Sequence, residues 1–325
     1  MSTLTPEQTK KVAALLQSLR GELGKAMIGQ VTVVEEVLIG LLAEAHVLLE
    51  GVPGLGKTLL VKALARTFSG NFARIQFTPD LMPSDVVGHT IFDMANNTFV
   101  TRRGPVFTHL LLADEINRAP AKTQSALLEA MQEYQVTLEG TASALPKPFM
   151  VLATQNPIEQ EGTYPLPEAQ LDRFLLKVRI DYPDAREEAA LTRSVTEKKS
   201  GADLGVEQVS SVIGPKHVES LQRAASMVDV DERVLDYAVR IVRATREHQG
   251  FSVGAGPRGS IALVRAARAA ALLQERAFVT PDDIRRIVLP ALRHRVTLSP
   301  EAEIEGFSPD SLLLSLLDSV PAPRS

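Results

Sequence analysis

Gly51-Val52-Pro53-Gly54-Leu55-Gly56-Lys57-Thr58 satisfies the pattern G-x-x-x-x-G-K-[ST], and it stands between the apolar run 45–50 and the helix-like stretch 59–68. A strand that ends abruptly in glycines lets backbone N–H groups surround a β-phosphate, and the next helix adds the positive end of its dipole. Lys57 can then reach the β- and γ-phosphates, and the Thr58 hydroxyl can coordinate Mg²⁺. A chance Lys-Thr pair after a glycine-rich turn is the alternative, but strand, loop and helix stand in the order that the motif requires. The sequence therefore predicts a nucleoside triphosphate site.

Length and composition narrow the class of protein. The chain has 325 residues, more than one typical domain, so we expect a larger α/β unit and a smaller second domain that share a nucleotide cleft. It has no cysteine, which excludes a disulfide framework, a thiolate zinc site and a cysteine nucleophile. No apolar run approaches the roughly twenty residues that span a bilayer, and residues 1–7 do not resemble a signal peptide. We expect a cytoplasmic protein without membrane insertion.

The charge balance argues against nucleic acid as a partner. Lys and Arg number 35 against 39 Asp and Glu, which gives a net charge of −4, and no basic run reaches five residues. A local basic patch stays compatible with these numbers. The six histidines are scattered without a His-Glu-x-x-His pair, so we expect them at the surface or in the core rather than on a metal.

The first half of the chain alternates between helix-like and strand-like segments. Thr5-Pro6-Glu7-Gln8 predicts a capped helix that runs to about Gly21, and a second helix ends near Ala45. Short apolar runs predict strands, separated by helix-like segments, at 45–50, 73–78, 109–113, 149–154 and 174–180. This pattern is typical of α/β folds and predicts a doubly wound, parallel five-stranded sheet with helices on both faces.

Two further segments complete the predicted organisation. Residues 90–101 form two β-prone runs around an Asn-Asn turn, and we interpret them as a hairpin inserted between the second and third strands. Beyond residue 183 the strand-like runs stop, and we expect helices at 231–248, 258–274 and 281–295, the last capped by Thr280. We therefore predict an α/β domain at 1–183 and an all-helical domain at 184–325.

Adjacent acids follow the strand Leu110-Leu111-Leu112-Ala113. Asp114 and Glu115 could simply begin an acidic loop, but a phosphate loop earlier in the chain favours a role in catalysis. Asp114 would hold the water shell of Mg²⁺, and Glu115 would orient and polarise the attacking water. A carboxylate available as a base distinguishes an ATP hydrolase from a plain nucleotide-binding protein.

Three more polar residues have both a structural and a functional interpretation. Asn156 ends an apolar strand and is either a turn residue before proline or a group aimed at the γ-phosphate and the attacking water. Arg173 either pairs with its neighbour Asp172 or acts as an arginine finger on the nucleotide of an adjacent subunit. Arg258 begins a helix of the second domain, where it either forms a salt bridge or closes on the phosphates.

Together these motifs resemble the MoxR family of AAA+ ATPases. The resemblance rests on residues 51–58, 76–85, 111–120, 153–174 and 254–258, so it covers nearly the whole first domain and continues into the second. The stretch 113–131 is especially specific. One departure is mild, because Gly254-Ala255-Gly256-Pro257-Arg258 has glycine where serine is commoner and keeps the arginine.

The resemblance implies a fold, ligands and residue roles. It implies an AAA+ sheet whose helix-two insert is the hairpin at about 88–104, a helical lid and a homo-oligomeric ring, commonly a hexamer. Asp114 and Glu115 correspond to Walker B, Asn156 to sensor 1, Arg173 to the arginine finger and Arg258 to sensor 2. Thr58 and Asp114 would bind Mg²⁺, and ATP would contact the adenine-side loop and the Walker A segment: Ile28, Gly29, Gly51, Val52, Pro53, Gly54, Leu55, Gly56, Lys57, Thr58 and Leu59.

The resemblance also implies a chaperone-like ATPase that acts with proteins carrying von Willebrand factor A domains. Such ATPases serve metalloenzyme maturation, complex assembly or stress response. No such domain is fused here, so we expect the partner to be another chain; Phe92 and Phe99 of the hairpin either contact it or pack against the core. The alternatives are a nucleic-acid motor, for which only Arg102 and Arg103 flank the hairpin, and a nucleotide-gated assembly switch that hydrolyses little.

Overall fold

Five parallel strands form the central sheet, in the spatial order β2-β5-β8-β1-β9. The computed structural model describes residues 4–52, 54–156, 163–196 and 206–323. The strands are β1 (Val47–Glu50), β2 (Phe72–Gln76), β5 (Leu110–Asp114), β8 (Met150–Gln155) and β9 (Leu176–Arg179). Each lies within one of the segments predicted from sequence or overlaps it, so the predicted α/β fold is confirmed. β8 lies between the phosphate-loop strand β1 and the acid-bearing strand β5, so Asn156, which follows β8, lies between the ends of these two strands.

Helices cover both faces of this sheet. Along β1, Val47 and Leu49 pack into one hydrophobic cluster and Leu48 into the other, because successive side chains of a strand point to opposite faces. The first cluster receives α1 (Pro6–Ala26), α2 (Val31–Leu42) and α3 (Lys57–Thr67), and the second receives α4 (Pro83–Val87) and α5 (Ala121–Glu133). The capping box at Thr5 is present, but α1 continues past Gly21 to Ala26, since glycine only weakens a helix that is buried along one side.

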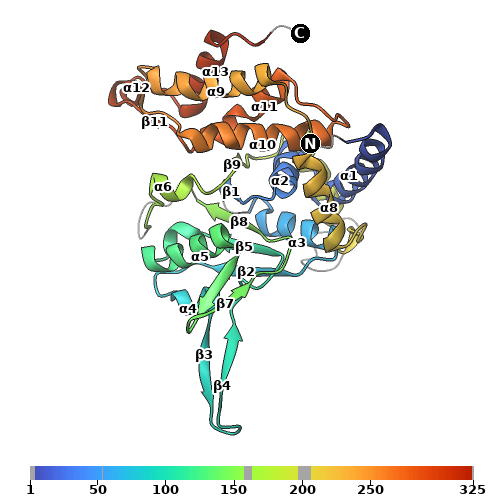
Figure 1. Cartoon of the computed structure of the whole chain (residues 1–325), viewed down its shortest axis with the longest axis vertical. Helices are drawn as coiled ribbons and strands as arrows, with labels where there is room; N and C mark the ends of the chain where they lie inside the picture. The colour runs from blue at the N-terminus through green and yellow to red at the C-terminus, as the bar shows by residue number, and fades with distance from the viewer. Residues whose placement is uncertain (1–3, 53, 157–162, 197–205, 324–325) are drawn as a thin grey trace.

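Two hairpins leave the sheet. The predicted insert is confirmed as β3 (Gly88–Asp93) paired with β4 (Thr98–Arg103), and Figure 1 shows it extending away from the body, on the side opposite to the C-terminal helices. Phe92 and Phe99 face each other across it, with ring centroids 5.1 Å apart. A second hairpin, β6 (Gln135–Leu138) with β7 (Thr141–Ala144), was not predicted, because its short runs carry little apolar alternation.

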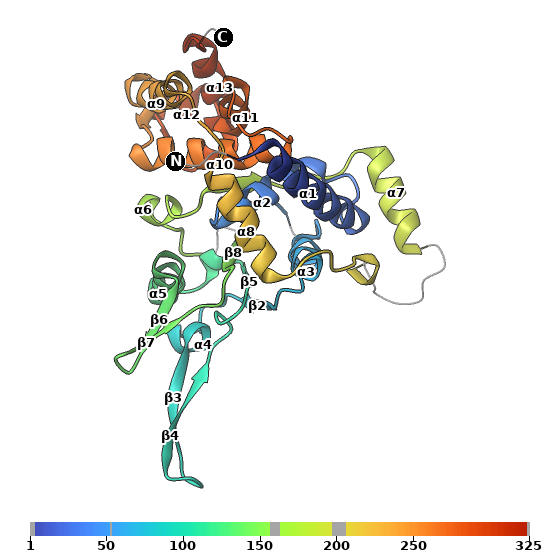
Figure 2. The same cartoon turned by 45° about the vertical axis from the view of Figure 1, so that its right-hand side comes forward.

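The chain after β9 is mostly helical. Its helices are α7 (Ala185–Thr196), the short η2 (Val206–Gln208), α8 (Pro215–Ser226), α9 (Glu232–Glu247), α10 (Pro257–Leu273), α11 (Pro281–Leu292), α12 (Pro300–Ile304) and α13 (Pro309–Ser319). Two short helices, η1 (Ile116–Arg118) and α6 (Glu168–Leu171), precede β9. The lid also contains an antiparallel pair, β10 (Phe251–Val253) with β11 (Thr297–Leu298), so it is not entirely helical as predicted. Figure 2 shows α7 apart from the other lid helices, on the side where α1 and α3 lie. No helix within the described ranges has the length and apolar character that a membrane crossing needs.

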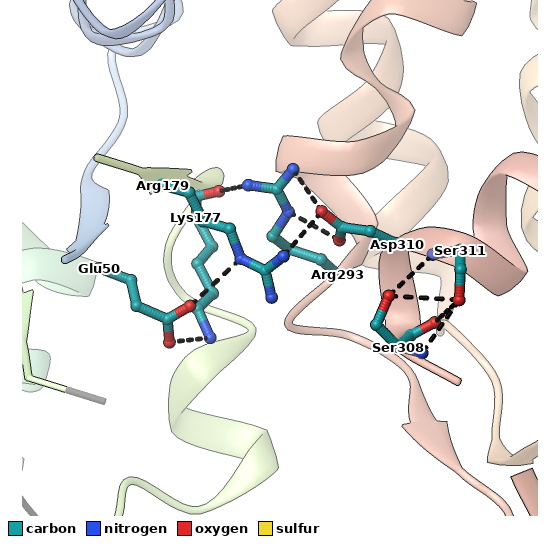
Figure 3. A network of polar contacts seen from close by, with 7 residues as sticks. All are labelled: Glu50, Lys177, Arg179, Arg293, Ser308, Asp310 and Ser311. Atoms are coloured by element: carbon teal, nitrogen blue, oxygen red, sulfur yellow. Dashed lines mark hydrogen bonds and ion pairs between the residues drawn. The ribbon is translucent and has the colours of Figure 1, made fainter. Parts of the chain in front are cut away.

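A charged network joins the lid to the strand that precedes the phosphate loop (Figure 3). Glu50 at the end of β1 pairs with Lys177 at 2.5 Å and with Arg179 at 3.4 Å, both on β9. Arg179 and Arg293 each lie 3.0 Å from Asp310 of α13, and Arg293 also donates to the carbonyl oxygen of Lys177. One hydrophobic cluster runs through core and lid alike, and the division at residue 183 stays a prediction.

Candidate functional site

A cavity of about 350 Å³ opens where the parallel strands end. Its wall combines the phosphate loop and the start of α3 with residues from the ends of β2, β5 and β8, which is where open α/β sheets bind ligands. The lining residues are Gly54, Gly56, Lys57, Thr58, Leu59, Arg74, Gln76, Asp114, Glu115 and Asn156. The structure thus brings the predicted acids and Asn156 to the predicted phosphate loop.

The phosphate loop has a backbone that glycine makes possible. Gly54 and Gly56 have φ angles of +90° and +78°, in the left-handed region that other residues rarely adopt. Gly56 is the N-cap of α3, so the first N–H groups of that helix have no intrahelical partners, and the residues that carry them line the cavity. An anion is the natural ligand of such a helix start. Pro53 lies outside the described residues.

Lys57 adds a positive charge to this cradle. Its Nζ donates to the carbonyl oxygen of Gly51 at 2.5 Å. Burial lowers the pKa of Lys57, while the carboxylates of Asp114, Glu115 and Glu50 oppose that shift by favouring the ammonium form. A bound phosphate would act in the same direction as these carboxylates and keep the amine charged.

Thr154 ties the two acids of β5 to the neighbouring strand. Its hydroxyl donates to Oδ1 of Asp114 at 2.7 Å and accepts from the backbone N–H of Glu115 at 2.8 Å. Glu115 has φ 56° and ψ 50°, a left-handed conformation that costs a non-glycine residue of the order of 1 kcal/mol and is typical of functional sites. The fully buried Thr154 therefore holds the backbone turn that separates the directions of the two carboxylates.

Two residues of the edge strand β2 engage the same acids. Arg74 donates to Oδ2 of Asp114 through Nη2 at 2.6 Å, and Gln76 donates to Oε2 of Glu115 at 2.6 Å. Sequence reasoning missed both. The signal was present in the alternation Arg74-Ile75-Gln76, which places the two polar side chains on one face of a strand, but their partners follow only from the pairing of β2 with β5.

The donor set fits Mg²⁺ held jointly with phosphates. Thr58 and Asp114 offer oxygen ligands in one cavity, and the described part of the chain contains no cluster of three or more histidine, cysteine or acidic residues that could hold a metal alone. Mg²⁺ is usually bound through one or two protein oxygens, substrate phosphates and water. The residues present suit that arrangement.

The predicted adenine-side loop lies beside the phosphate loop but does not line the cavity. Gly29 has φ +76°, and a Cβ there would lie 2.7 Å from Cβ of Glu187 on α7. The side chain of Gln30 donates to the carbonyl oxygen of Asp181 at 3.1 Å. The loop with Ile28 and Gly29 is therefore packed between α1, α2 and the start of α7.

Arg173 and Arg258 line a different cavity, of about 310 Å³, which shares no lining residue with the first. Nη1 of Arg173 donates to the carbonyl oxygen of Leu128 at 2.8 Å, while its buried Nε has no hydrogen-bond partner. Asp172 pairs with Arg295 at 2.7 Å and with Arg258 at 3.7 Å. The structure thus brings Arg173 and Arg258 together at this cavity. Arg258 forms a salt bridge, which is one of its two sequence interpretations, and its closing on phosphates stays a prediction.

Known proteins resemble both halves of the chain. The profile described as "ATPase family associated with various cellular activities (AAA)" matches residues 46–176, and that of the AAA lid domain matches residues 243–314. The Bacillus subtilis protein YeaC is 47% identical and covers 93% of this chain and 92% of its own. Chaperone MoxR1 of Mycobacterium tuberculosis is 43% identical over 93% of this chain and 81% of its own. A crystal structure of a Cytophaga hutchinsonii protein, 41% identical, superimposes with a TM-score of 0.90 over 98% of both chains.

Proposed function

Because this chain belongs to the MoxR family of AAA+ ATPases, we propose that it hydrolyses ATP with Mg²⁺ to drive chaperone-like remodelling, maturation or assembly of partner proteins. The observation that carries the proposal is the convergence of Lys57, Asp114, Glu115 and Asn156 on one cavity. A relative over most of the chain, MoxR1, is named a chaperone, which supports the remodelling role.

In the proposed reaction the chain's own residues position the phosphates and move one proton. The N–H groups at the start of α3 and the ammonium of Lys57 bind the β- and γ-phosphates, and Thr58 with Asp114 holds the metal. Mg²⁺ would supply charge stabilisation at the phosphate oxygens. Glu115 accepts a proton from the attacking water, whose oxygen displaces ADP from the γ-phosphorus, and Asn156 orients that water.

Thr154→Val is expected to lower turnover by about tenfold to 100-fold while ATP binding is retained. The change removes a hydroxyl that bonds to both Asp114 and the N–H of Glu115, so both acids lose a positioning contact. Phosphate release and ATP titration measure the two quantities separately. Thr154→Ser keeps the hydroxyl, so its turnover should stay close to that of the parent. If Thr154→Val turned over ATP at the parent rate, the hydroxyl would not position the acids.

We also propose that the protein forms a ring, commonly a hexamer in this family, in which Arg173 and Arg258 act on the nucleotide of an adjacent subunit. Their shared cavity supports this proposal, because it holds four arginines against two acidic residues and is separate from the cavity that contains Lys57. An anion from a neighbouring chain would balance that excess of positive charge and give the buried Nε of Arg173 a partner.

The proposed partner is a separate protein with a von Willebrand factor A domain, whose affinity depends on the bound nucleotide. Affinity capture with Glu115→Gln protein in ATP and in ADP, followed by identification of the bound chains, tests this. Recovery of such a protein preferentially in one nucleotide state would support the proposal. Its absence from every nucleotide state would count against the partner but would leave ATP hydrolysis standing.

Phe99→Ala is expected to reduce partner-stimulated turnover severalfold without changing basal turnover. Phe92 and Phe99 are 47% and 76% exposed and pack on each other, so they do not fill the core, and truncating an aromatic contact commonly costs an interface about 1–2 kcal/mol. Turnover with and without the captured partner is the measurement. Phe307→Ala, at a position of the lid that is 46% exposed, is the control. Equal stimulation of parent and Phe99→Ala protein would remove the hairpin from partner binding.

A further inference from the structure

Arg74 forms hydrogen bonds to the oxygen of Asp114 that a metal would need. Both Nε and Nη2 of Arg74 donate to Oδ2, at 3.1 Å and 2.6 Å, while Oδ1 accepts from Thr154. The hydroxyl of Thr154 is buried and already fixed by the N–H of Glu115, so Oδ1 is committed to a structural contact. Oδ2 is the exchangeable oxygen, and in this structure an arginine holds it.

The surroundings of Arg74 allow it to leave. Its side chain is 46% exposed, and its other hydrogen bond goes to Gln76 two residues along the same strand. β2 is the edge strand of the sheet, so no further strand confines Arg74 on its outer side. Arg74 also lines the same cavity as Lys57, so its guanidinium stays near the phosphates after it releases Asp114.

We propose that Arg74 is the exchangeable counter-ion of Asp114, an inference that rests on the nucleotide site proposed above. Without ligand the guanidinium neutralises Asp114 beside the second acid, Glu115. When Mg²⁺ and nucleotide bind, Arg74 releases Oδ2, which then contacts the metal or its water shell. The guanidinium of Arg74 pairs with the phosphates instead. Arg74 is thus a positioning residue that sets the metal concentration at which the site loads.

The test is the Mn²⁺ concentration that gives half-maximal binding of a fluorescent, non-hydrolysable ATP analogue. Arg74→Ala removes the competitor for Oδ2, so this concentration should fall about fivefold, the scale of a partly exposed ion pair. The analogue's affinity at saturating Mn²⁺ should fall, because a phosphate-facing cation is lost. Arg74→Lys keeps the positive charge but bonds to a carboxylate with poorer geometry, so its half-maximal Mn²⁺ concentration should lie between those of Arg74→Ala and the parent.

Arg118→Ala is the matched control. Arg118 lies 3.2 Å from Glu115, so its removal deletes one positive charge near the same acid pair without freeing Oδ2 of Asp114. The proposed exchange would be wrong if the half-maximal Mn²⁺ concentration fell equally in Arg118→Ala. It would also be wrong if that concentration stayed the same or rose in Arg74→Ala. If the parent failed to bind the analogue at any Mn²⁺ concentration, the proposed nucleotide site itself would be wrong. If the parent bound it and Arg74→Ala needed the same Mn²⁺ concentration as the parent, only the role of Arg74 would be rejected. Thermal melting of each variant confirms that the proteins compared are folded.

Discussion

Lys57→Ala should lose tight ATP binding, whereas Glu115→Gln should keep ATP bound and lose turnover. Among the described residues, Lys57 is the one lysine that lines the phosphate-loop cavity. A charge-assisted hydrogen bond contributes roughly 1.5–3 kcal/mol, so removing the ammonium should weaken ATP binding by about tenfold to 100-fold or more. Glutamine keeps the shape of Glu115 and its contact with Gln76 but cannot accept a proton, which should lower turnover by about 10²–10⁴-fold.

Binding and turnover must be measured separately on both variants. Titration calorimetry gives the affinity for ATP, and phosphate release gives the rate. Lys62→Ala, an exposed lysine on the same helix, is the control for loss of a charge from α3 and should change neither. Turnover at the parent rate in Glu115→Gln would mean that another group is the base.

Arg173→Ala should lose turnover by about 10³-fold or more while its ATP affinity stays near that of the parent, as expected for an arginine that acts on a neighbour's nucleotide. Inactive Arg173→Ala and inactive Lys57→Ala subunits should regain partial activity when mixed. In a mixed ring some interfaces pair an intact phosphate loop with an intact Arg173 from the adjacent subunit. No recovery despite verified co-assembly would leave the action between subunits unsupported.

A second mixture tests the position of Arg258. Because Arg173 and Arg258 line one cavity of one chain, a mixture of Arg173→Ala with Arg258→Ala should stay inactive: no subunit offers both arginines to its neighbour. If Arg258 served the phosphate loop of its own chain, the same mixture would recover. Lys57→Ala mixed with Arg258→Ala should recover in the first case and stay inactive in the second.

Local sequence determined the parts of this protein that depend on neighbouring residues. The phosphate loop requires glycines, lysine and threonine at fixed spacing, and the capping boxes of Thr5 and Thr280 close over three residues. Short apolar runs were enough for the five strands of the sheet, and the turn at Asn96-Asn97 was enough for the inserted hairpin. Such features form within a few residues, so their pattern is visible along the chain.

Tertiary structure alone decided which distant groups meet. Arg74 and Asp114 are partners because β2 pairs with β5, and Thr154 reaches the same acid because β8 lies on the other side. Arg258 lies beside Asp172 rather than the phosphate loop because α10 packs against α1 and α2 on one side of the sheet. These contacts are set by how strands order and helices pack, and burial of apolar surface drives that packing without regard to where the polar residues stand in the sequence.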